Sequence, residues 1–270
     1  MVHRSTKRLS AKPRPTPQRA RRILDILERA HPEAKCALDH RNAFELAVAT
    51  ILSAQCTDER VNQVTPVLFE RYPDARTLAA APLPDVEEII RSTGFFRAKA
   101  RSITGFARGL VEGHGGEVPR TMQELVRLPG IGRKTANVVL GHAFGVNEGI
   151  AVDTHVLRVT NRLGLVDSGD PAVVEAALMK LVPRERWTRT TDLLIFHGRK
   201  ICDARRPACG ICPVFTLCAW ERKQAWASGV PRHGASATRE PRVFPTRRPA
   251  AARRARPSRA RSGRARRSAK

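Results

Sequence analysis

Four cysteines within seventeen residues constrain this chain more than any other feature of its sequence. They follow the spacing Cys-x6-Cys-x2-Cys-x5-Cys and stand at Cys202, Cys209, Cys212 and Cys218. A secreted chain could pair them in disulfides, but the first apolar run follows a basic, proline-rich segment and does not form a secretory signal. Four thiolates suit a tetrahedral zinc ion or an iron–sulfur cluster. Zinc modules usually offer two close Cys pairs and this segment has one, so the spacing favours a cluster and leaves zinc open.

The body of the chain, from residue 23 to residue 220, shows helical periodicity almost throughout. The expected helical segments are Ile23–Leu27, Phe44–Ala54, Val86–Arg91, Lys99–Leu110, Met122–Leu128, Arg133–Phe144, His155–Leu163, Val173–Leu181 and Thr191–Lys200. Strand-like alternation is nearly missing, and Gly149–Val152 is the one plausible extended piece. The run Phe44–Ala54 is apolar on all sides but too short to cross a bilayer, so we expect a core helix. The sequence therefore predicts an all-α fold without a membrane span.

Positive charge is concentrated at the two ends of the chain. The formal net charge is +24, yet the stretch between residues 23 and 220 is nearly neutral. Residues 1–22 and 221–270 are rich in Arg, Pro and Ser and cannot bury a core, so we expect a disordered basic arm and a disordered basic tail. An organelle transit peptide is an alternative for the arm. Its prolines disfavour that reading, because they break an amphipathic helix.

A two-glycine turn predicts a helix–hairpin–helix motif. Thr121 and Glu124 form a capping-box pattern that starts the first helix, and the second helix begins near Arg133. Gly130 and Gly132 bracket the turn, where glycines let a phosphate approach the backbone amides closely. The dipole of the second helix also favours an anion there. We expect Gly130, Gly132 and Arg133 to contact a DNA phosphate without base readout, with a plain αα-turn as the alternative.

Two residues near this motif carry chemistry suited to covalent catalysis. Lys134 lies in the first turn of the second helix, where the dipole disfavours the protonated amine, and a neutral amine can form a Schiff base. Its position alone would favour an ordinary surface lysine. Asp153 stands at an N-cap position, where amides would hold it ionised and able to stabilise a developing cation. Arg205 and Arg206 lie between the first two clustered cysteines, in a loop able to touch phosphates.

The motifs LPGIGRKTANVVL, AVDTHV and HGRKIC…CGIC…C occur in this order and resemble the endonuclease III family of helix–hairpin–helix DNA glycosylases. The segments SAQCTDERVN and STGFFRAKA match further parts of that family. The similarity spans residues 23–220 and leaves out both basic ends.

The resemblance implies two α-helical lobes with a DNA-binding cleft between them. A six-helix barrel lobe with the hairpin would cover residues 36–146, and an iron–sulfur lobe would join residues 23–35 to residues 147–220. The four clustered cysteines correspond to the ligands of a [4Fe–4S] cluster, so the resemblance selects iron–sulfur over zinc. Residues 1–22 and 221–270 would remain a basic arm and a basic tail.

Individual roles follow from the same resemblance. Lys134 matches the nucleophile of the family and Asp153 its essential carboxylate. Gln55 matches the residue that fills the gap left by the flipped nucleotide. Phe95 stands where a bulky apolar side chain wedges into the opposite strand, although leucine is common there.

The resemblance thus implies a bifunctional DNA glycosylase and AP lyase of base excision repair. It would excise oxidised pyrimidines and cleave the abasic strand by β-elimination. The expected partner is double-stranded DNA with damaged bases or abasic sites. We expect the protein to be a monomer without membrane contact. We expect it in the bacterial cytoplasm, associated with the nucleoid. One alternative is a mismatch glycosylase without lyase chemistry, whose members usually lack lysine at position 134. The other is a non-catalytic iron–sulfur DNA-binding module, which the joint presence of Lys134 and Asp153 disfavours.

Overall fold

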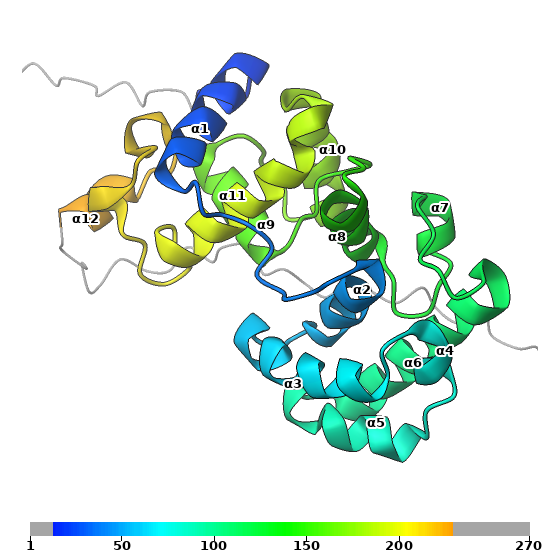
Figure 1. Ribbon diagram of the computed structural model, residues 1–270. Helices are drawn as coiled ribbons and strands as arrows, with labels where there is room; N and C mark the ends of the chain where they lie inside the picture. Colours follow the sequence, from blue (N-terminus) through cyan, green and yellow to red (C-terminus); the bar gives the residue numbers. More distant parts are fainter. Residues whose placement is uncertain (1–12, 229–270) are drawn as a thin grey trace, which may run out of the picture.

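The computed structural model describes residues 13–228, and within that range every regular element is a helix (Figure 1). One half of the molecule contains α2 (Ala43–Leu52), α3 (Asp58–Arg71), α4 (Ala75–Ala79), α5 (Leu83–Ile89), η1 (Arg91–Thr93), α6 (Phe96–His114), α7 (Met122–Leu125) and α8 (Arg133–Phe144). We call this half the barrel lobe. The predicted all-α fold is confirmed.

The other half contains the N-terminal helix and everything after α8. Its elements are α1 (Pro17–Ala30), α9 (Thr154–Leu163), α10 (Pro171–Leu181), η2 (Arg184–Arg186), α11 (Trp187–Lys200), η3 (Cys209–Ile211), η4 (Phe215–Leu217) and α12 (Lys223–Ala227). We call this half the cysteine lobe. In Figure 1 it lies at the upper left, with the barrel lobe at the lower right.

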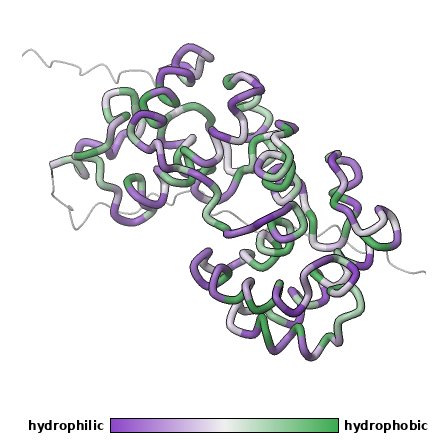
Figure 2. Tube along the Cα trace, viewed as in Figure 1, coloured by the Kyte–Doolittle hydropathy of each residue, from purple (hydrophilic) through white to green (hydrophobic). Residues whose placement is uncertain are grey.

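Each lobe has its own hydrophobic core. The barrel-lobe core is built from buried residues between Leu38 and Leu140, joined by Ala151. The cysteine-lobe core combines residues of α1 with residues from Ile150 to Val214. Apolar and polar residues alternate along the helices (Figure 2), as amphipathic helices require when one face packs inward. The N-terminal helix therefore completes the lobe formed by the second half of the chain.

Helix α2 is the exception to this alternation. All of its residues from Phe44 to Leu52 are buried, including Glu45, which pairs with Arg41 at 2.5 Å. The expectation of a core helix at this apolar run is confirmed, although the helix ends at Leu52, before the predicted Ala54. Within the described part of the chain, no helix is long and apolar enough to cross a membrane.

Helix α8 joins the two lobes. It packs against α2 in the barrel lobe and against α11 in the cysteine lobe. Gly141 makes the second contact close, because a Cβ at that position would collide with the side chain of Thr188. The helix that follows the hairpin thus has one face toward each lobe.

The structure corrects the predicted start of the first helix. The basic arm was expected to be disordered through residue 22, but α1 begins at Pro17. Thr16 caps it by accepting a hydrogen bond from the Arg19 amide at 3.2 Å. Proline fits the first turn of a helix, because its missing N–H would have no partner there. Pro17, which was expected to break a helix, is therefore the first residue of α1.

The predicted tail boundary is corrected as well. Residues 221–228 belong to the ordered cysteine lobe, and α12 packs against η3. The Lys223 ammonium donates to the carbonyl oxygens of Phe215 at 2.8 Å and Cys218 at 2.5 Å. The predictions for residues 1–12 and 229–270 lie outside the described residues.

Candidate functional site

One pocket between the lobes contains both residues predicted to carry the chemistry. Lys134 reaches it from α8, and Asp153 from the segment that precedes α9. Ser53, at the end of α2, lines the barrel-lobe side. We call this cavity the Lys134 pocket. The prediction that Lys134 and Asp153 act together is consistent with this geometry.

Asp153 combines two roles in one position. It is the N-cap of α9, and its Oδ1 accepts a hydrogen bond from the Val156 amide at 2.8 Å. The predicted capping is therefore present. Asp153 also lines the Lys134 pocket, so the cap holds its carboxyl group at the wall of the cavity that contains Lys134.

The hairpin before α8 has the predicted two-glycine geometry. Gly130 has a φ of +78°, and a Cβ there would lie 3.2 Å from Ile51 Cδ1 and from Ser102 Cβ. Gly132 is the N-cap of α8 without a side-chain cap, and open space surrounds it. The first helix is shorter than predicted. Helix α7 ends at Leu125, since the capping interaction of Thr121 starts only one turn.

Two predicted DNA-inserting residues have unusual backbone conformations. Gln55 has a φ of +53° and Phe95 a φ of +48°, and they are the non-glycine residues with positive φ within residues 13–228. Both side chains are exposed, and Phe95 retains 69% of its surface. Such strain persists where surrounding structure imposes it, and it is often found at functional sites. An exposed phenyl group on a strained turn is poorly explained by folding alone.

The arginines predicted to contact DNA differ in whether other residues of the protein already engage their side chains. Arg133 Nε donates to Glu175 Oε2 at 2.7 Å, so its guanidinium is partly committed to α10. Arg205 and Arg206 are exposed, and their backbone amides donate to Asp203 Oδ1 at 2.8 and 2.7 Å. These backbone hydrogen bonds, first that of Arg206, lower the pKa of Asp203. The Asp203 carboxylate thus shapes the loop that presents both arginines.

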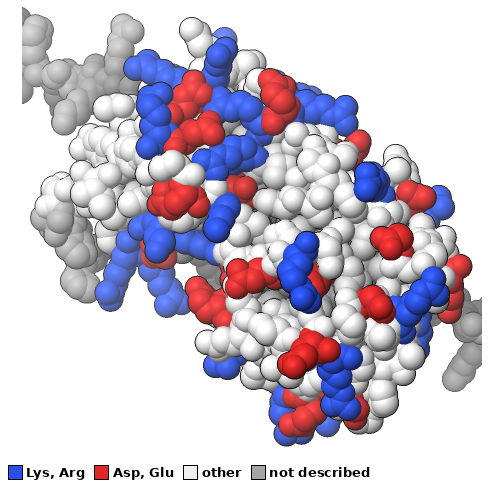
Figure 3. Space-filling model, in the orientation of Figure 1, with Lys and Arg blue, Asp and Glu red and all other residues white. Residues whose placement is uncertain are grey.

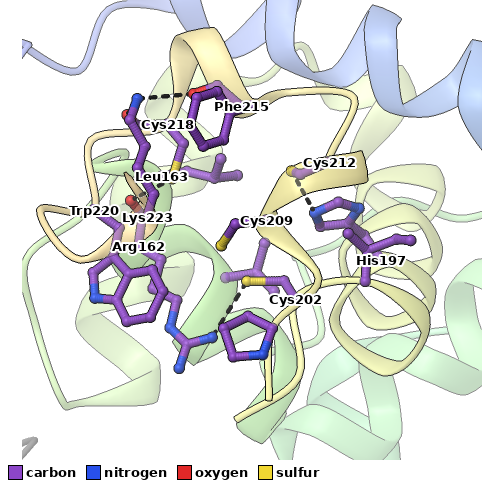
Figure 4. Close-up of a pocket in the computed structure, with 13 residues that line it drawn as sticks. Arg162, Leu163, His197, Cys202, Cys209, Cys212, Phe215, Cys218, Trp220 and Lys223 are labelled. Atoms are coloured by element: carbon purple, nitrogen blue, oxygen red, sulfur yellow. Dashed lines mark hydrogen bonds between the residues drawn. The ribbon is translucent and has the colours of Figure 1, made fainter. Parts of the chain in front are cut away.

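The four clustered cysteines surround a second cavity, shown in Figure 4. Within residues 13–228, no group of three or more His, Cys, Asp or Glu side chains converges closely enough for a single metal ion. All four cysteines line this one cavity, which suits four thiolate ligands around an iron–sulfur cluster. Burial raises the pKa of the Cys212 thiol to about 11, so a bound cation would be needed to hold this thiol as a thiolate near neutral pH. The residues fit a [4Fe–4S] cluster.

The groups around this cavity also suit a set of thiolates. Arg162 Nη1 lies 3.5 Å from Cys202 Sγ. His197 Nε2 lies 3.7 Å from Cys212 Sγ on the opposite side of the cavity (Figure 4). Lys223 closes a third side through the carbonyl contacts described above. Arg162 thus places positive charge beside one sulfur atom, whereas burial lowers the pKa of His197 to about 4 and leaves a neutral imidazole beside Cys212.

Two polar pairs in the Lys134 pocket were not predicted from the sequence. Arg199 Nη1 on α11 lies 2.6 Å from Asp58 Oδ2 on α3, which joins the lobes across the pocket. His142 Nε2 on α8 lies 2.9 Å from Asp192 Oδ1 on α11. The partners of each pair are far apart in the chain, so no local motif signals either of them.

Comparisons with known proteins agree with this site. Residues 48–184 match the family model of the HhH-GPD superfamily base excision DNA repair protein. Residues 202–218, which contain all four clustered cysteines, match the iron–sulfur binding domain of endonuclease III. Endonuclease III from Synechocystis sp. is 55% identical over 201 residues, covering 74% of this chain and 92% of the relative. Endonuclease III from Escherichia coli is 43% identical over 204 residues, covering 74% and 95%.

Solved structures give the same result. A trapped covalent intermediate of endonuclease III with DNA superimposes with a TM-score of 0.73 and 48% identity, covering 77% of this chain and 97% of that one. A thermostable thymine-DNA glycosylase shares the fold at a TM-score of 0.67 and 23% identity. The enzyme class predicted from the sequence, a DNA glycosylase with AP lyase activity, and the predicted [4Fe–4S] cluster are confirmed by these relatives. The chain belongs to the endonuclease III family of the HhH-GPD superfamily of base excision DNA repair proteins.

Proposed function

We propose that this protein excises oxidised pyrimidines from duplex DNA, with Lys134 as the nucleophile and Asp153 as the supporting carboxylate. The observation that carries the proposal is that both side chains line one pocket between the lobes. The capture of a related endonuclease III as a covalent intermediate with DNA supports a nucleophilic side chain in such a pocket. A mismatch glycosylase without lyase chemistry would have no use for an amine at this place.

In the first half of the reaction, a bond from C1′ of the sugar to Lys134 replaces the glycosidic bond to the damaged base. The damaged nucleotide leaves the stack, because its glycosidic bond cannot be reached inside the duplex. The neutral amine of Lys134 attacks C1′ of the sugar, the electron pair of the glycosidic bond departs with the base, and the base takes up a proton. Asp153 stabilises the positive charge that develops on the sugar. Loss of a proton from nitrogen and opening of the sugar ring give the Schiff base.

The second half breaks the strand. The cationic Schiff base acidifies the proton on C2′, and its removal expels the 3′ phosphate as the C3′–O bond breaks. Water then hydrolyses the Schiff base and restores Lys134. Every step uses groups of the protein, DNA and solvent.

DNA would be held by local contacts, since the stretch between residues 23 and 220 is nearly neutral. Basic and acidic side chains are interspersed over the face shown in Figure 3. Gly130 and Gly132 would offer backbone amides to one phosphate near the lesion. Arg205 and Arg206 would hold a second stretch of backbone. Gln55 would fill the gap left by the flipped nucleotide and Phe95 would wedge into the opposite strand.

The remaining assignments concern the whole molecule. We propose lobe boundaries at residues 36–146 and at 23–35 with 147–220, extended by α1 from Pro17 and by α12. The cluster, held by the four cysteines, would supply folding energy and fix the Asp203 loop against DNA. We also propose a monomer that acts on the DNA of a bacterial cell, and the bacterial origin of the relatives reported above supports the bacterial setting.

A panel of duplexes tests this function. Each duplex would contain thymine glycol, an A·G mismatch, an abasic site or no lesion at one labelled position. We expect excision of thymine glycol and cleavage at the abasic site, with strand breaks that appear without added alkali, because β-elimination follows from the Schiff base. The undamaged and mismatched duplexes should stay intact.

The opposite pattern would contradict the proposal. Excision from the A·G mismatch with strand breaks only after alkali would identify a monofunctional mismatch enzyme. Binding of all duplexes without any cleavage would identify a non-catalytic module.

A further inference from the structure

A second titratable pair lies in the Lys134 pocket beside Lys134 and Asp153. His142 comes from the last turn of α8, and Asp192 from the middle of α11. His142 Nε2 lies 2.9 Å from Asp192 Oδ1, and the two side chains are 13% and 11% exposed. Burying an ion pair costs solvation, so a pair that faces a catalytic pocket is a candidate for function.

The hydrogen bonds of His142 fix the charge of the pair. Its Nδ1 lies 3.0 Å from the carbonyl oxygen of Val138, which can only accept, so Nδ1 carries a proton. Nε2 must then carry a second proton to donate to ionised Asp192. Burial opposes this cation, but the hydrogen bond and charge of Asp192 outweigh burial and raise the pKa of His142. A carboxylate beside this cation accepts hydrogen bonds and donates none.

One oxygen of Asp192 remains available to the pocket. Oδ1 is engaged by His142, whereas Oδ2 has no hydrogen-bond partner among residues 13–228. Oδ2 is also not fully buried. Because Asp192 lines the Lys134 pocket, this oxygen is open to that cavity. Both ring N–H groups of His142 are engaged. Of the two residues, Asp192 is the one able to bond a ligand.

His142 lies on the same face of α8 as Lys134, and Asp192 faces it from α11. Lys134, Val138 and His142 are spaced four residues apart on α8, and all three line the pocket. Eight residues of helix rise about 12 Å, so Lys134 and His142 mark the two ends of one wall of the pocket. A base whose sugar reaches Lys134 can therefore extend its ring toward Asp192.

We propose that Asp192, held in place by His142, recognises the flipped-out base by accepting a hydrogen bond from one of its N–H groups. The inference rests on the proposed function and deepens it by naming the substrate class. The preferred lesions keep an N–H at the ring edge, as thymine glycol does at N3. Carbonyl oxygens only accept, so a carboxylate repels a base that presents carbonyls alone toward Asp192.

A cycle that changes both the enzyme and the base tests the proposal. The holoenzyme and its Asp192→Ala variant would excise thymine glycol and N3-methylthymine glycol from the same duplex under single-turnover conditions. Methylation removes the N–H, and we expect it to slow the wild-type protein by about tenfold to a hundredfold, the range for a hydrogen bond to a charged group. In Asp192→Ala the methyl penalty should shrink several-fold. The cycle separates the hydrogen bond from the bulk of the methyl group.

Cleavage at a preformed abasic site provides the control, because that substrate has no base. Asp192→Ala and Asp192→Asn should both cleave it at the wild-type rate, which also shows that the variants fold. Glu112→Gln removes an exposed carboxylate from α6 and should leave both reactions unchanged.

Three outcomes would overturn the inference. Equal losses on thymine glycol and on the abasic site would mean that the pair positions Lys134 and does not contact the base. If N3-methylation slowed Asp192→Ala as much as it slows the wild-type protein, Asp192 would not accept a hydrogen bond from the N3–H group. Wild-type protein inactive on both substrates would overturn the proposed function, and this inference with it.

Discussion

Gly130 and Gly132 share one hairpin but face different constraints. At Gly130 the left-handed backbone and the contacts with Ile51 and Ser102 both exclude a side chain. At Gly132 the backbone is extended, with a φ of −96°, and nothing lies close enough to meet a Cβ. The fold therefore requires the first glycine. The second has a side that is open to a phosphate.

Alanine at each position should separate stability from DNA binding. Gly130→Ala should lower the free energy of unfolding by about 1–3 kcal/mol, because it adds backbone strain and a steric contact. Gly132→Ala should change it by about 1 kcal/mol or less, the scale of an N-cap replacement. It should nevertheless weaken binding to a duplex with an uncleavable abasic analogue, since its methyl group would occupy the path of the phosphate. Urea denaturation and fluorescence anisotropy measure the two effects. If Gly132→Ala bound DNA as tightly as the wild-type protein, Gly132 would not be part of the DNA interface.

At the scale of elements, the two ends of the ordered region show how helix boundaries are set. Thr16 and Pro17 start α1, and this start brings Arg19 close enough to donate to the carbonyl oxygens of Leu163 and Leu217 at 2.5 and 2.6 Å. At the other end, α12 packs against η3, beside two of the cluster cysteines. Both terminal elements therefore brace the cysteine loop, although the start of α1 and the whole of α12 were not expected from composition.

The brace at Lys223 leads to a prediction about the cluster. Lys223→Met keeps the length of the side chain but removes its hydrogen bonds to the carbonyls of Phe215 and Cys218. We expect loss of iron under a chelator to accelerate roughly fivefold, since hydrogen bonds from a partly exposed charge contribute about 1 kcal/mol. Visible absorbance and iron content follow the loss. Lys180→Met on α10 is the control, because that lysine is exposed and far from the cysteines in sequence. Equal rates of iron loss in both variants would mean that α12 does not protect the cluster.

At the scale of the whole molecule, the pocket exists because two separately packed lobes meet at α8. Lys134 comes from the helix that contacts both lobes, whereas Asp153 is fixed by the first turn of α9 in the cysteine lobe. The Asp58–Arg199 ion pair links the lobes across the same cavity. The geometry of the reacting groups therefore depends on how the lobes pack, and not on one element.

This dependence on packing sets the limit of what the sequence could predict. The all-α class, the hairpin and the four cysteines were predictable, because each rests on spacing within a short segment. Lys134 and Asp153 each stand at a recognisable helix start, but their predicted roles came from the family resemblance, because position alone would favour an ordinary surface lysine. Asp192 and His142 were not predictable, because their contact joins positions 50 residues apart on helices of ordinary pattern.

Covalent trapping tests the central claim, that Lys134 is the nucleophile, most directly. Wild-type protein and Lys134→Gln would be incubated with abasic-site duplex and borohydride, with Lys180→Gln as the control. Proteolysis and mass spectrometry of the adduct would then locate the DNA on the chain. We expect full trapping at Lys134 in the wild-type and control proteins, and no adduct in Lys134→Gln despite measurable DNA binding, because removal of the nucleophile removes the intermediate. An adduct at wild-type yield in Lys134→Gln, or one mapped to another residue, would contradict the account.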